Sequence, residues 1–563
     1  MTARVFQRGL GVLALGALLI GCSPNSREDG DSQTNWLEAC RDDSQCSKGN
    51  KCLCGVCTRA CVVATVSKPT DLCIDVQQGS CVVSTDEGVI AQCGGSPPPT
   101  AGLCMIRCSD AKGCGRDQAC VAGLCSPLPD APVDVTVDVD TRHQDLVGFG
   151  ASVAYGEGQI TAHPQQAKLY GAIFSDLGLD ILRFRNRFQH VGDDDLKTAG
   201  QLVSAGNSAL GRSLGVFMST WSPPAALKAN NALVCSGNAP TCTLIRNAAG
   251  AFDYAGLADY WTGSLAAYAK VGVVPDYIGI QNNPNYIPSS AESNEACRFL
   301  PTEGSIMVPS GATTVTAKYP GLAQAQTALV DALSGLANRP KLLAPESSDF
   351  VSAVDYVTSL DVAKTDAFAH QLYGVDPAAV DLDGLAAMGK LAAQSNRPVF
   401  VTEMQADGFD TALLIHYATV VEGASAYLQA ALTGPVSGPL TNTQALIGID
   451  TASFRIQDPY HAMRHFAENT DPGWTRVDAG AAANALLVSA WQSPTGQDLT
   501  LVLINSHSVE VSARLKLPGD WSSSRVIRSV FSGIERYKVL GALSSEGIVR
   551  LPPASVVTVA LSR

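Results

Sequence analysis

Short apolar runs alternate with longer segments of helical period through the middle of the chain. The longer segments, such as residues 165–177, 254–270, 322–336 and 411–422, repeat apolar side chains at the spacing of amphipathic helices. The runs that have the length of strands are residues 147–151, 181–184, 216–220, 277–281, 342–345, 367–373, 399–404 and 424–431. Strands separated by helices form a parallel sheet, and eight of them close a (β/α)8 TIM barrel. We therefore predict an α/β fold with such a barrel over residues 145–455.

An open, doubly wound sheet would show the same alternation of strands and helices. Sheets of that kind that bind nucleotides carry a glycine-rich phosphate loop after the first strand. No such loop follows residues 147–151, so the barrel is the preferred interpretation.

Alternation of apolar and polar residues predicts a second, all-β region beside the barrel. After a helical segment at 460–467, the alternating segments are 485–492, 499–506, 509–517, 525–531 and 556–561. Turn signals separate them, which predicts an antiparallel β-sandwich over residues 456–563. Residues 133–139 alternate in the same way. The barrel offers that strand no partner, so we expect residues 133–144 to join the sandwich.

Cysteine is concentrated near the amino terminus, where 14 of the 18 lie in the region 40–125. Cys40, Cys46, Cys52 and Cys57 recur without gaps 68 residues later, so this region contains an internal repeat. In an exported protein an even number of cysteines predicts disulfides rather than zinc, although their pairing cannot be deduced. A stalk and a binding module both remain open as its role. Linkers at residues 22–39 and 126–132 flank the region, and the second is rich in proline.

The first 21 residues have the composition of a secretory signal. Arg4 and Arg8 precede an uncharged apolar run at 10–20, which is shorter than the roughly 20 residues that span a bilayer. Residues 19–22, Leu-Ile-Gly-Cys, resemble the bacterial lipobox. That resemblance implies lipid on Cys22, and hence an exported protein anchored at an outer membrane or cell surface.

Charge excludes one class of partner. The formal net charge is -13 and no basic cluster occurs, so nucleic acid is not expected as a partner. Neutral polymers and small molecules remain open. The acidic run at 193–195 is assigned to a solvated loop rather than to a calcium site, and we expect neither a metal nor a cofactor.

In a TIM barrel the chemistry lies where the strands end at the carboxyl face. The side chains at or near those ends are Arg183, Arg185, Trp221, Gln281, Asn282, Asn283, Glu346, His370, Tyr373, Glu403 and Gln429. Such a set suits a sugar, because aromatic faces stack on pyranose rings and amides meet hydroxyl groups. A carboxylate can then attack the anomeric carbon.

These segments resemble glycoside hydrolase family 30, the group of glucosylceramidases, β-1,6-glucanases and glucuronoxylanases, from about residue 133 to the carboxyl terminus. The motifs are GFGAS at 148–152, LR at 182–183, WSPPA at 221–225, QNNP at 281–284, LAPES at 343–347, HQLYG at 370–374, VTEM at 401–404 and PGWTRV at 472–477. Each alone is weak, but eight in the family's order are specific. The resemblance implies a retaining enzyme for a β-linked polysaccharide or glycoconjugate.

The resemblance also assigns roles. Glu403 is implied to be the nucleophile, with pairing to Arg183 as barrel scaffolding the alternative. Asn282 would meet the sugar 2-hydroxyl, Tyr373 would orient the nucleophile, and Trp221 would form a sugar-facing wall. The substrate-binding candidates are therefore Asn282, Trp221, Tyr373, His370 and Arg183.

The chain departs from the family at the acid/base position, where Asn283 replaces the Glu of a Gln-Asn-Glu-Pro motif. A retaining glycosidase needs a second carboxylate, and an amide cannot supply its proton. Strand eight also lacks the Trp commonly found there. Glu292, Glu295 and Glu346 are candidate substitutes. The hypotheses that remain are an impaired or unconventional glycosidase, a carbohydrate-binding pseudoenzyme and a structural lipoprotein.

Three cysteines lie beyond the dense region. Cys235 and Cys242 are close enough along the chain to pair across a short loop. Cys297 is then an odd thiol, with no motif that would make it a nucleophile.

Overall fold

The computed structural model describes residues 131–563 apart from 191–192, 237–239, 287, 289–292, 311–312, 437–441 and 484–485. Nearer the amino terminus it describes 36–47, 49–61, 73, 79–83, 89, 93, 102–108, 114, 118–121 and 123–127. The expected signal at 1–21 and the lipidation site Cys22 lie outside these residues. No helix within them has both the length and the apolar character needed to cross a membrane. The chain separates into two compact units, Met1–Ile106 and Arg107–Arg563.

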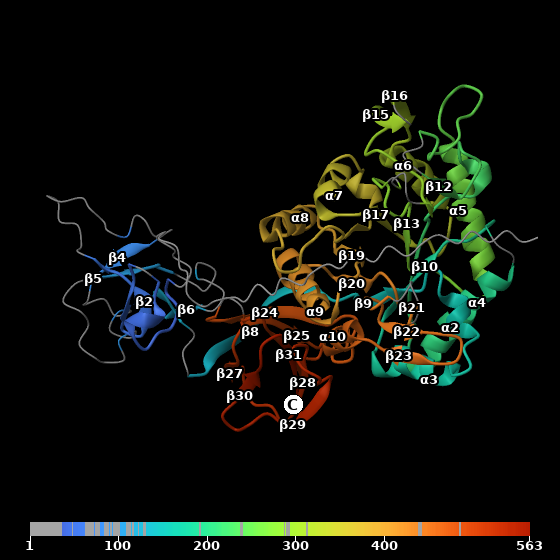
Figure 1. The fold of residues 1–563 in the computed structure, drawn as a ribbon. Coiled ribbons are helices and arrows are strands. Elements are labelled where there is room, and N and C mark those ends of the chain that lie inside the picture. The colour runs from blue at the N-terminus through green and yellow to red at the C-terminus, as the bar shows by residue number, and fades with distance from the viewer. Residues whose placement is uncertain are drawn as a thin grey trace, which may run out of the picture. The chain divides into compact units, whose positions relative to one another are not determined.

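Eight parallel strands of the larger unit form a closed barrel, in which β9 pairs with both β10 and β20 (Figure 1). The strands are β9 (Gly148–Ser152), β10 (Ile181–Arg185), β11 (Gly215–Ser219), β13 (Tyr277–Gly279), β17 (Lys341–Ser347), β18 (Ala367–Gln371), β19 (Val399–Glu403) and β20 (Ala426–Gln429). Each lies within two residues of a predicted strand at its start. The predicted (β/α)8 barrel is therefore confirmed.

Helices connect the strands and cover the outside of the barrel (Figure 1). They are α2 (Glu157–Thr161), α3 (Gln166–Tyr170), α4 (Asp193–Leu210), α5 (Tyr254–Ala269), α6 (Leu322–Leu333), α7 (Phe350–Val357), α8 (Leu382–Gln394) and α9 (Gly408–His416). The helical periods predicted at 165–177 and 411–422 continue into π-helical turns, Gly171–Asp176 and Tyr417–Glu422. The acidic run at 193–195 begins α4, so its assignment to a loop was wrong.

Large side chains fill the barrel below its carboxyl end. Ile181, Phe217, Leu343, Phe400 and Leu428 form one buried cluster contributed by five of the strands. Side chains alternate between the two faces of a strand. Because Ile181 points inward, the residues two and four positions later on β10 also face the interior, above this apolar layer. The barrel thus supplies a packed floor for polar groups near its carboxyl end.

The C-terminal region forms the side sheet, nine strands in the order β29-β28-β31-β26-β25-β24-β8-β27-β30. They are β8 (Val133–Asp145), β24 (Thr475–Ala481), β25 (Leu486–Gln492), β26 (Asp498–Asn505), β27 (Val511–Lys516), β28 (Ser523–Val530), β29 (Lys538–Gly541), β30 (Ile548–Leu551) and β31 (Ser555–Ser562). Strand β8 joins the sheet as expected, antiparallel to β24 and parallel to β27. Val526 of β28 and Val549 of β30 belong to the same buried hydrophobic cluster, although the two strands lie near opposite edges of the sheet. The sheet is therefore rolled, and its inner face encloses the core of this domain.

Seven disulfides crosslink the cysteine-rich region, and the two copies of its repeat are paired alike. Cys40–Cys52 and Cys46–Cys57 in the first copy correspond to Cys108–Cys120 and Cys114–Cys125 in the second. The remaining bridges are Cys54–Cys93, Cys61–Cys81 and Cys73–Cys104. The described sulfur atoms close enough to share a metal ion belong to these disulfides. The first copy lies in the smaller unit and the second in the larger one.

Candidate active site

Glu403 is the last residue of β19, and its side chain is 12% exposed at the carboxyl end of the barrel. The Tyr373 hydroxyl donates to Oε1 at 2.6 Å, and Arg183 Nη1 donates to Oε2 at 2.5 Å. Gln371 Nε2 is a more distant donor to Oε2, at 3.4 Å. Both oxygens are therefore oriented by donors, while an edge of the carboxylate stays within reach of a ligand.

Asn282 is held by two of the same donors, Arg183 and Gln371. Its Oδ1 accepts hydrogen bonds from Arg183 Nη2 and Gln371 Nε2, both at 2.7 Å. Its backbone N–H donates to the carbonyl of Thr220 at 2.7 Å, which fixes the start of the loop after β13. Since the oxygen already accepts two bonds, the amide nitrogen is the part of this side chain that can serve a ligand.

Arg183 lies at the centre of this network and not at its surface. Its side chain is fully buried, and its guanidinium bridges Glu403 and Glu346. The Trp221 ring covers the guanidinium, with the ring centroid 4.4 Å from Cζ. Both terminal nitrogens, Nη1 and Nη2, donate to neighbouring side chains, and the expected role of Arg183 in binding a ligand stays a prediction. The side chain positions the residues that can meet one.

His370 is also withdrawn from the surface. Its Nε2 pairs with Glu422 Oε1 at 2.5 Å, and its Nδ1 lies 3.0 Å from the Gln371 carbonyl. The ring is completely buried, and the Glu422 carboxylate helps to raise its pKa against the opposing effect of burial. His370 therefore ties β18 to the turn after α9 in this structure, and its expected role in substrate binding stays a prediction.

Asn283 follows Asn282 at the acid/base position, with its backbone in the left-handed region at φ 50°. Asparagine is among the few residues that tolerate this conformation. Its N–H donates to the carbonyl of Glu346 at 3.0 Å, and its buried Oδ1 has no hydrogen-bond partner within the described part of the chain. An amide, rather than a carboxyl group, therefore occupies the place where the resemblance puts the proton donor.

The two described candidate substitutes are both engaged. Glu346 is completely buried against Arg183 and Ser219. Glu295 lies on β14 (Ser293–Glu295), with its side chain 14% exposed and Oε1 2.7 Å from Arg185 Nη1. The third candidate, Glu292, lies outside the described residues.

Glu295 and Arg185 form a second polar group that sequence reasoning did not connect. The Arg185 guanidinium lies 3.8 Å from the ring centroid of Tyr155, a residue that is 59% exposed just beyond β9. Although more than half of the residue's surface is exposed, partial desolvation by the surrounding protein, followed by the charge of Glu295, raises the pKa of the Tyr155 hydroxyl, and Glu403 contributes in the same direction. Tyr155 thus lies within electrostatic reach of Glu403. Its φ of 67° is rare for an aromatic residue, a signal that appears only in the folded backbone.

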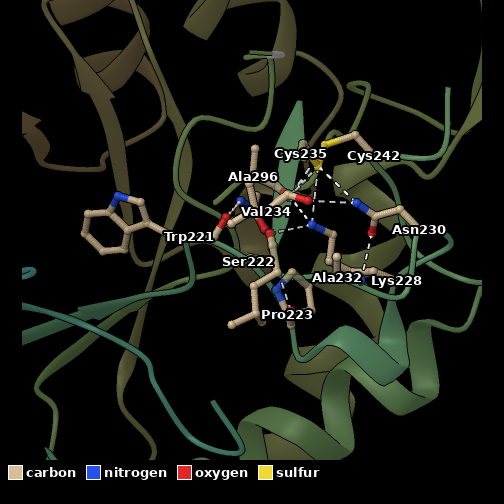
Figure 2. Close-up of a disulfide and its surroundings, with 12 residues drawn as sticks. Trp221, Ser222, Pro223, Lys228, Asn230, Ala232, Val234, Cys235, Cys242 and Ala296 are labelled. Atoms are coloured by element: carbon tan, nitrogen blue, oxygen red, sulfur yellow. Dashed lines mark hydrogen bonds between the residues drawn. A yellow bond between two sulfur atoms is a disulfide. The ribbon is translucent and has the colours of Figure 1, made fainter. Parts of the chain in front are cut away.

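A disulfide crosslinks the loop that carries Trp221, and a pair of short strands joins this loop to the one that carries Glu295. Cys235 pairs with Cys242, and β12 (Val234–Ser236) pairs with β14. The buried Lys228 ammonium donates to the Ala296 carbonyl at 2.6 Å and to the Leu233 carbonyl at 2.8 Å. Figure 2 shows that the Trp221 ring points away from the disulfide and Lys228. These contacts hold the loop that carries the ring.

The odd thiol expected from the sequence is confirmed. Among the described cysteines, Cys297 alone is unpaired, and it is buried. Burial raises the pKa of its thiol to about 12, so it is not a thiolate at neutral pH.

A cavity of about 1040 Å³ lies at the opposite, amino end of the barrel. Asp180, Arg212, Asp276 and Lys341 line it. Asp180 supports the barrel here by accepting the Phe149 N–H at 3.0 Å and pairing with Arg212. The lining residues do not include Glu403 or the groups that hold it, so this cavity is separate from the candidate active site.

Comparison with known proteins shows which fold this is. No protein-family model and no curated protein sequence matches the chain. Among solved structures it is similar to a glycoside hydrolase family 30 subfamily 8 xylanase from Clostridium acetobutylicum (20% identity, TM-score 0.57, 76% of this chain and 100% of that one). It is also similar to the catalytic domain of a family 30 xylanase from Talaromyces cellulolyticus (19%, 0.58, 76% and 100%). The endo-β1,6-glucanase BT3312 is similar at 14% identity and a TM-score of 0.56 (77% and 96%). The chain therefore has the barrel-and-sheet fold of family 30 glycoside hydrolases.

Proposed function

We propose that the carboxyl end of the barrel is a retaining glycosidase-type site for a β-linked polysaccharide or glycoconjugate, in which catalysis is impaired. The observation that carries the proposal is the Glu403 carboxylate, accessible and oriented on both oxygens by Tyr373 and Arg183. This is how a group that attacks an anomeric carbon must be held. The solved structures with the same fold include enzymes named as xylanases and a β1,6-glucanase, which supports the carbohydrate assignment.

In the first step, Oε1 or Oε2 of Glu403 would attack the anomeric carbon and displace the leaving oxygen, forming a glycosyl ester. The Asn282 amide nitrogen can donate to a neighbouring sugar hydroxyl, since Arg183 and Gln371 occupy its oxygen. The leaving oxygen needs a proton from a second carboxyl group about 5–5.5 Å from the nucleophile. Asn283 supplies no such proton, so the step would run well only with leaving groups that need none.

A binding protein without turnover is the second candidate function. The engagement of the other acids favours it, because Glu346 is sealed from ligands and Glu295 is held by Arg185. In that case Glu403 would serve as a hydrogen-bond acceptor for glycan. Both candidates use the same site and the same ligand class.

We further propose export and attachment to an outer membrane or cell surface through lipid on Cys22. The order of residues 19–22 supports this proposal. An anchored glycan-binding barrel would hold its ligand at the cell.

The decisive experiment measures binding and cleavage side by side on β-1,3-, β-1,4- and β-1,6-glucans and on xylan. Reducing-sugar release reports cleavage, and affinity electrophoresis in gels containing each polysaccharide reports binding. We expect binding to at least one polymer, with slow or no cleavage, and loss of any cleavage in Glu403→Gln. Absence of binding and cleavage across the panel, together with no reaction of Glu403 with activated aryl β-glycosides, would contradict the proposal.

A further inference from the structure

Glu346 is a buried acid that the proposed reaction does not use. It is the extra residue of a bulge in β17, where the register against β18 shifts between Pro345 and Ser347, and its φ is 59°. A bulge re-aims a side chain, and here it turns the carboxylate into the barrel. The left-handed backbone at a residue with a long side chain is uncommon and points to a functional constraint.

The neighbouring strand leaves space for this carboxylate. A Cβ atom on Gly279 of β13 would lie 1.6 Å from Glu346 Oε2, closer than any atoms can approach. Any other residue at 279 would therefore displace the acid. Gly279 and Glu346 are a matched pair, so the buried acid is built into the fold and does not merely fill a gap.

Glu346 contacts both halves of the site. Its Oε1 accepts from Arg183 Nη2 at 2.9 Å, while Nη1 of the same guanidinium donates to Glu403. Its backbone carbonyl accepts the Asn283 N–H at 3.0 Å. One residue thus anchors the acid/base position and shares the cation that holds the nucleophile.

The surroundings accommodate Glu346 with or without its charge. Ser219 Oγ of β11 lies 2.7 Å from Oε1 and 2.8 Å from Oε2, and a hydroxyl can donate to a carboxylate or accept from a carboxylic acid. The ionisable groups that face the acid are Arg183 from β10 and Glu403 from β19, with Tyr373 beyond Glu403. Burial is the largest influence and raises the pKa of Glu346 to about 7.

We propose that Glu346 is a positioning residue that determines how strongly the Arg183 guanidinium neutralises the Glu403 carboxylate. When Glu346 is ionised, two carboxylates share one guanidinium, so Glu403 is less neutralised and attacks more readily. When Glu346 is neutral, the guanidinium pairs with Glu403 alone and lowers its nucleophilicity. The inference rests on the proposed role of Glu403, and it adds a control that the family resemblance does not assign.

The first test needs no ligand. A double-mutant cycle combines Glu346→Gln with Glu403→Gln in the full chain, and urea unfolding is measured at about pH 8, above the pKa of Glu346. Both acids compete for Arg183, so the two substitutions should not act independently. We expect the unfolding equilibrium constant of the double variant to differ by roughly threefold or more from the value that the two single variants predict. The matched control is Asp180→Asn with Glu403→Gln. Asp180 is a buried acid with its pKa also raised to about 7, but it lies at the amino end of the barrel, so that cycle should be additive.

The second test follows the reaction of Glu403 with 2,4-dinitrophenyl 2-deoxy-2-fluoro-β-glycosides of glucose and xylose, read by intact mass. The labelling rate should rise roughly threefold to tenfold as pH increases through about 7, the size expected for one neighbouring charge. Glu346→Gln should remove this step, and Asp180→Asn should keep it. Ser219→Ala removes a hydrogen-bond donor to the Glu346 carboxylate, so it should move the step in labelling rate to higher pH. This variant replaces Glu346→Gln as the test if Glu346→Gln folds poorly.

The outcomes separate the two proposals. An additive Glu346–Glu403 cycle, or a pH step that persists in Glu346→Gln, overturns the role of Glu346. Failure of every glycoside to label the wild type contradicts the nucleophile assignment instead, and the unfolding cycle still decides the coupling between the two acids.

Discussion

The hydroxyl of Tyr373 lies 2.6 Å from Oε1 of Glu403, although the tyrosine follows β18 and the glutamate ends β19. Burial and the adjacent Glu403 charge raise the pKa of Tyr373 far above its ordinary value, so the phenol remains a donor at every working pH. The resemblance to family 30 implied this orienting role, and the contact is consistent with it.

Tyr373→Phe should slow formation of the glycosyl ester on Glu403 by roughly tenfold to a hundredfold, the cost of losing one hydrogen bond to a charged group. The rate of labelling by an activated fluoroglycoside measures it. Tyr427→Phe is the matched control, since Tyr427 is buried on the adjacent β20 and its hydroxyl has no hydrogen-bond partner in the described residues. Equal rates in wild type and Tyr373→Phe would show that the contact does not serve the reaction.

Asn283→Glu should raise polysaccharide cleavage by about 10²–10⁴, because it restores a general acid/base. Asn283→Gln lengthens the side chain at the same left-handed position without adding a carboxyl group, so it should give no gain. In the wild type, azide should speed turnover of activated aryl glycosides by attacking the glycosyl ester directly. Ordinary cleavage rates in the wild type, with no gain in the Glu variant, would mean that another acid serves, and Glu295 would be the first to replace.

Stability should fall as pH decreases below about 6.5, because buried neutral histidines gain protons only on unfolding. His465 bonds Thr558 and Ser529 at 2.8 and 2.9 Å, joining α10 (Asp458–Ala467) to the side sheet. Burial lowers its pKa to about 3. The folded pKa lies below the unfolded one, so its contribution is complete above 6.5 and decreases by about 1.4 kcal/mol per pH unit as pH falls toward 3. Urea unfolding from neutral to acid pH should show a shallower decline in stability for His465→Gln than for the wild type, and identical declines would contradict this role of His465.

Replacing both Cys235 and Cys242 by Ser should destabilise the larger unit by about 2 kcal/mol, as expected for a short crosslinked loop. Lys228 would still bond the Ala296 and Leu233 carbonyls, so the fold should survive. Thermal unfolding measures the stability change, and proteolysis should expose new cleavage sites near residues 230–245. A double variant as stable and protease-resistant as the wild type would show that the disulfide is dispensable to this loop.

Cys22→Ser should move the exported protein from the detergent phase to the aqueous phase in phase partitioning. The physical reason is that an acyl chain gains about 0.8 kcal/mol per buried CH₂ group in a membrane. Cys297→Ser removes a buried thiol without touching the lipidation site, so its partitioning should match the wild type. Unchanged partitioning of Cys22→Ser would remove the case for a lipid anchor.

Local patterns determined most of the barrel. Each strand could be predicted because its apolar pattern is contained within a few consecutive residues. The carboxyl ends of the parallel strands then meet at one face of the barrel. Reading those ends therefore collected Glu403, Tyr373 and Asn282, which the structure brings together. The departure at Asn283 was also visible in the sequence, since one amide replaces one carboxyl group.

Tertiary structure decided which of these groups remain accessible. Arg183 and His370 stand on barrel strands like Glu403, but each is enclosed by partners from distant strands and turns, so both side chains are buried. The parallel pairing of β8 with β27 also depends on contacts between segments hundreds of residues apart. The clearest case is Gly279 beside Glu346. Periodicity fixes the face of a strand but not the volume left by its neighbour, and that volume is what lets a buried acid share the cation of the nucleophile.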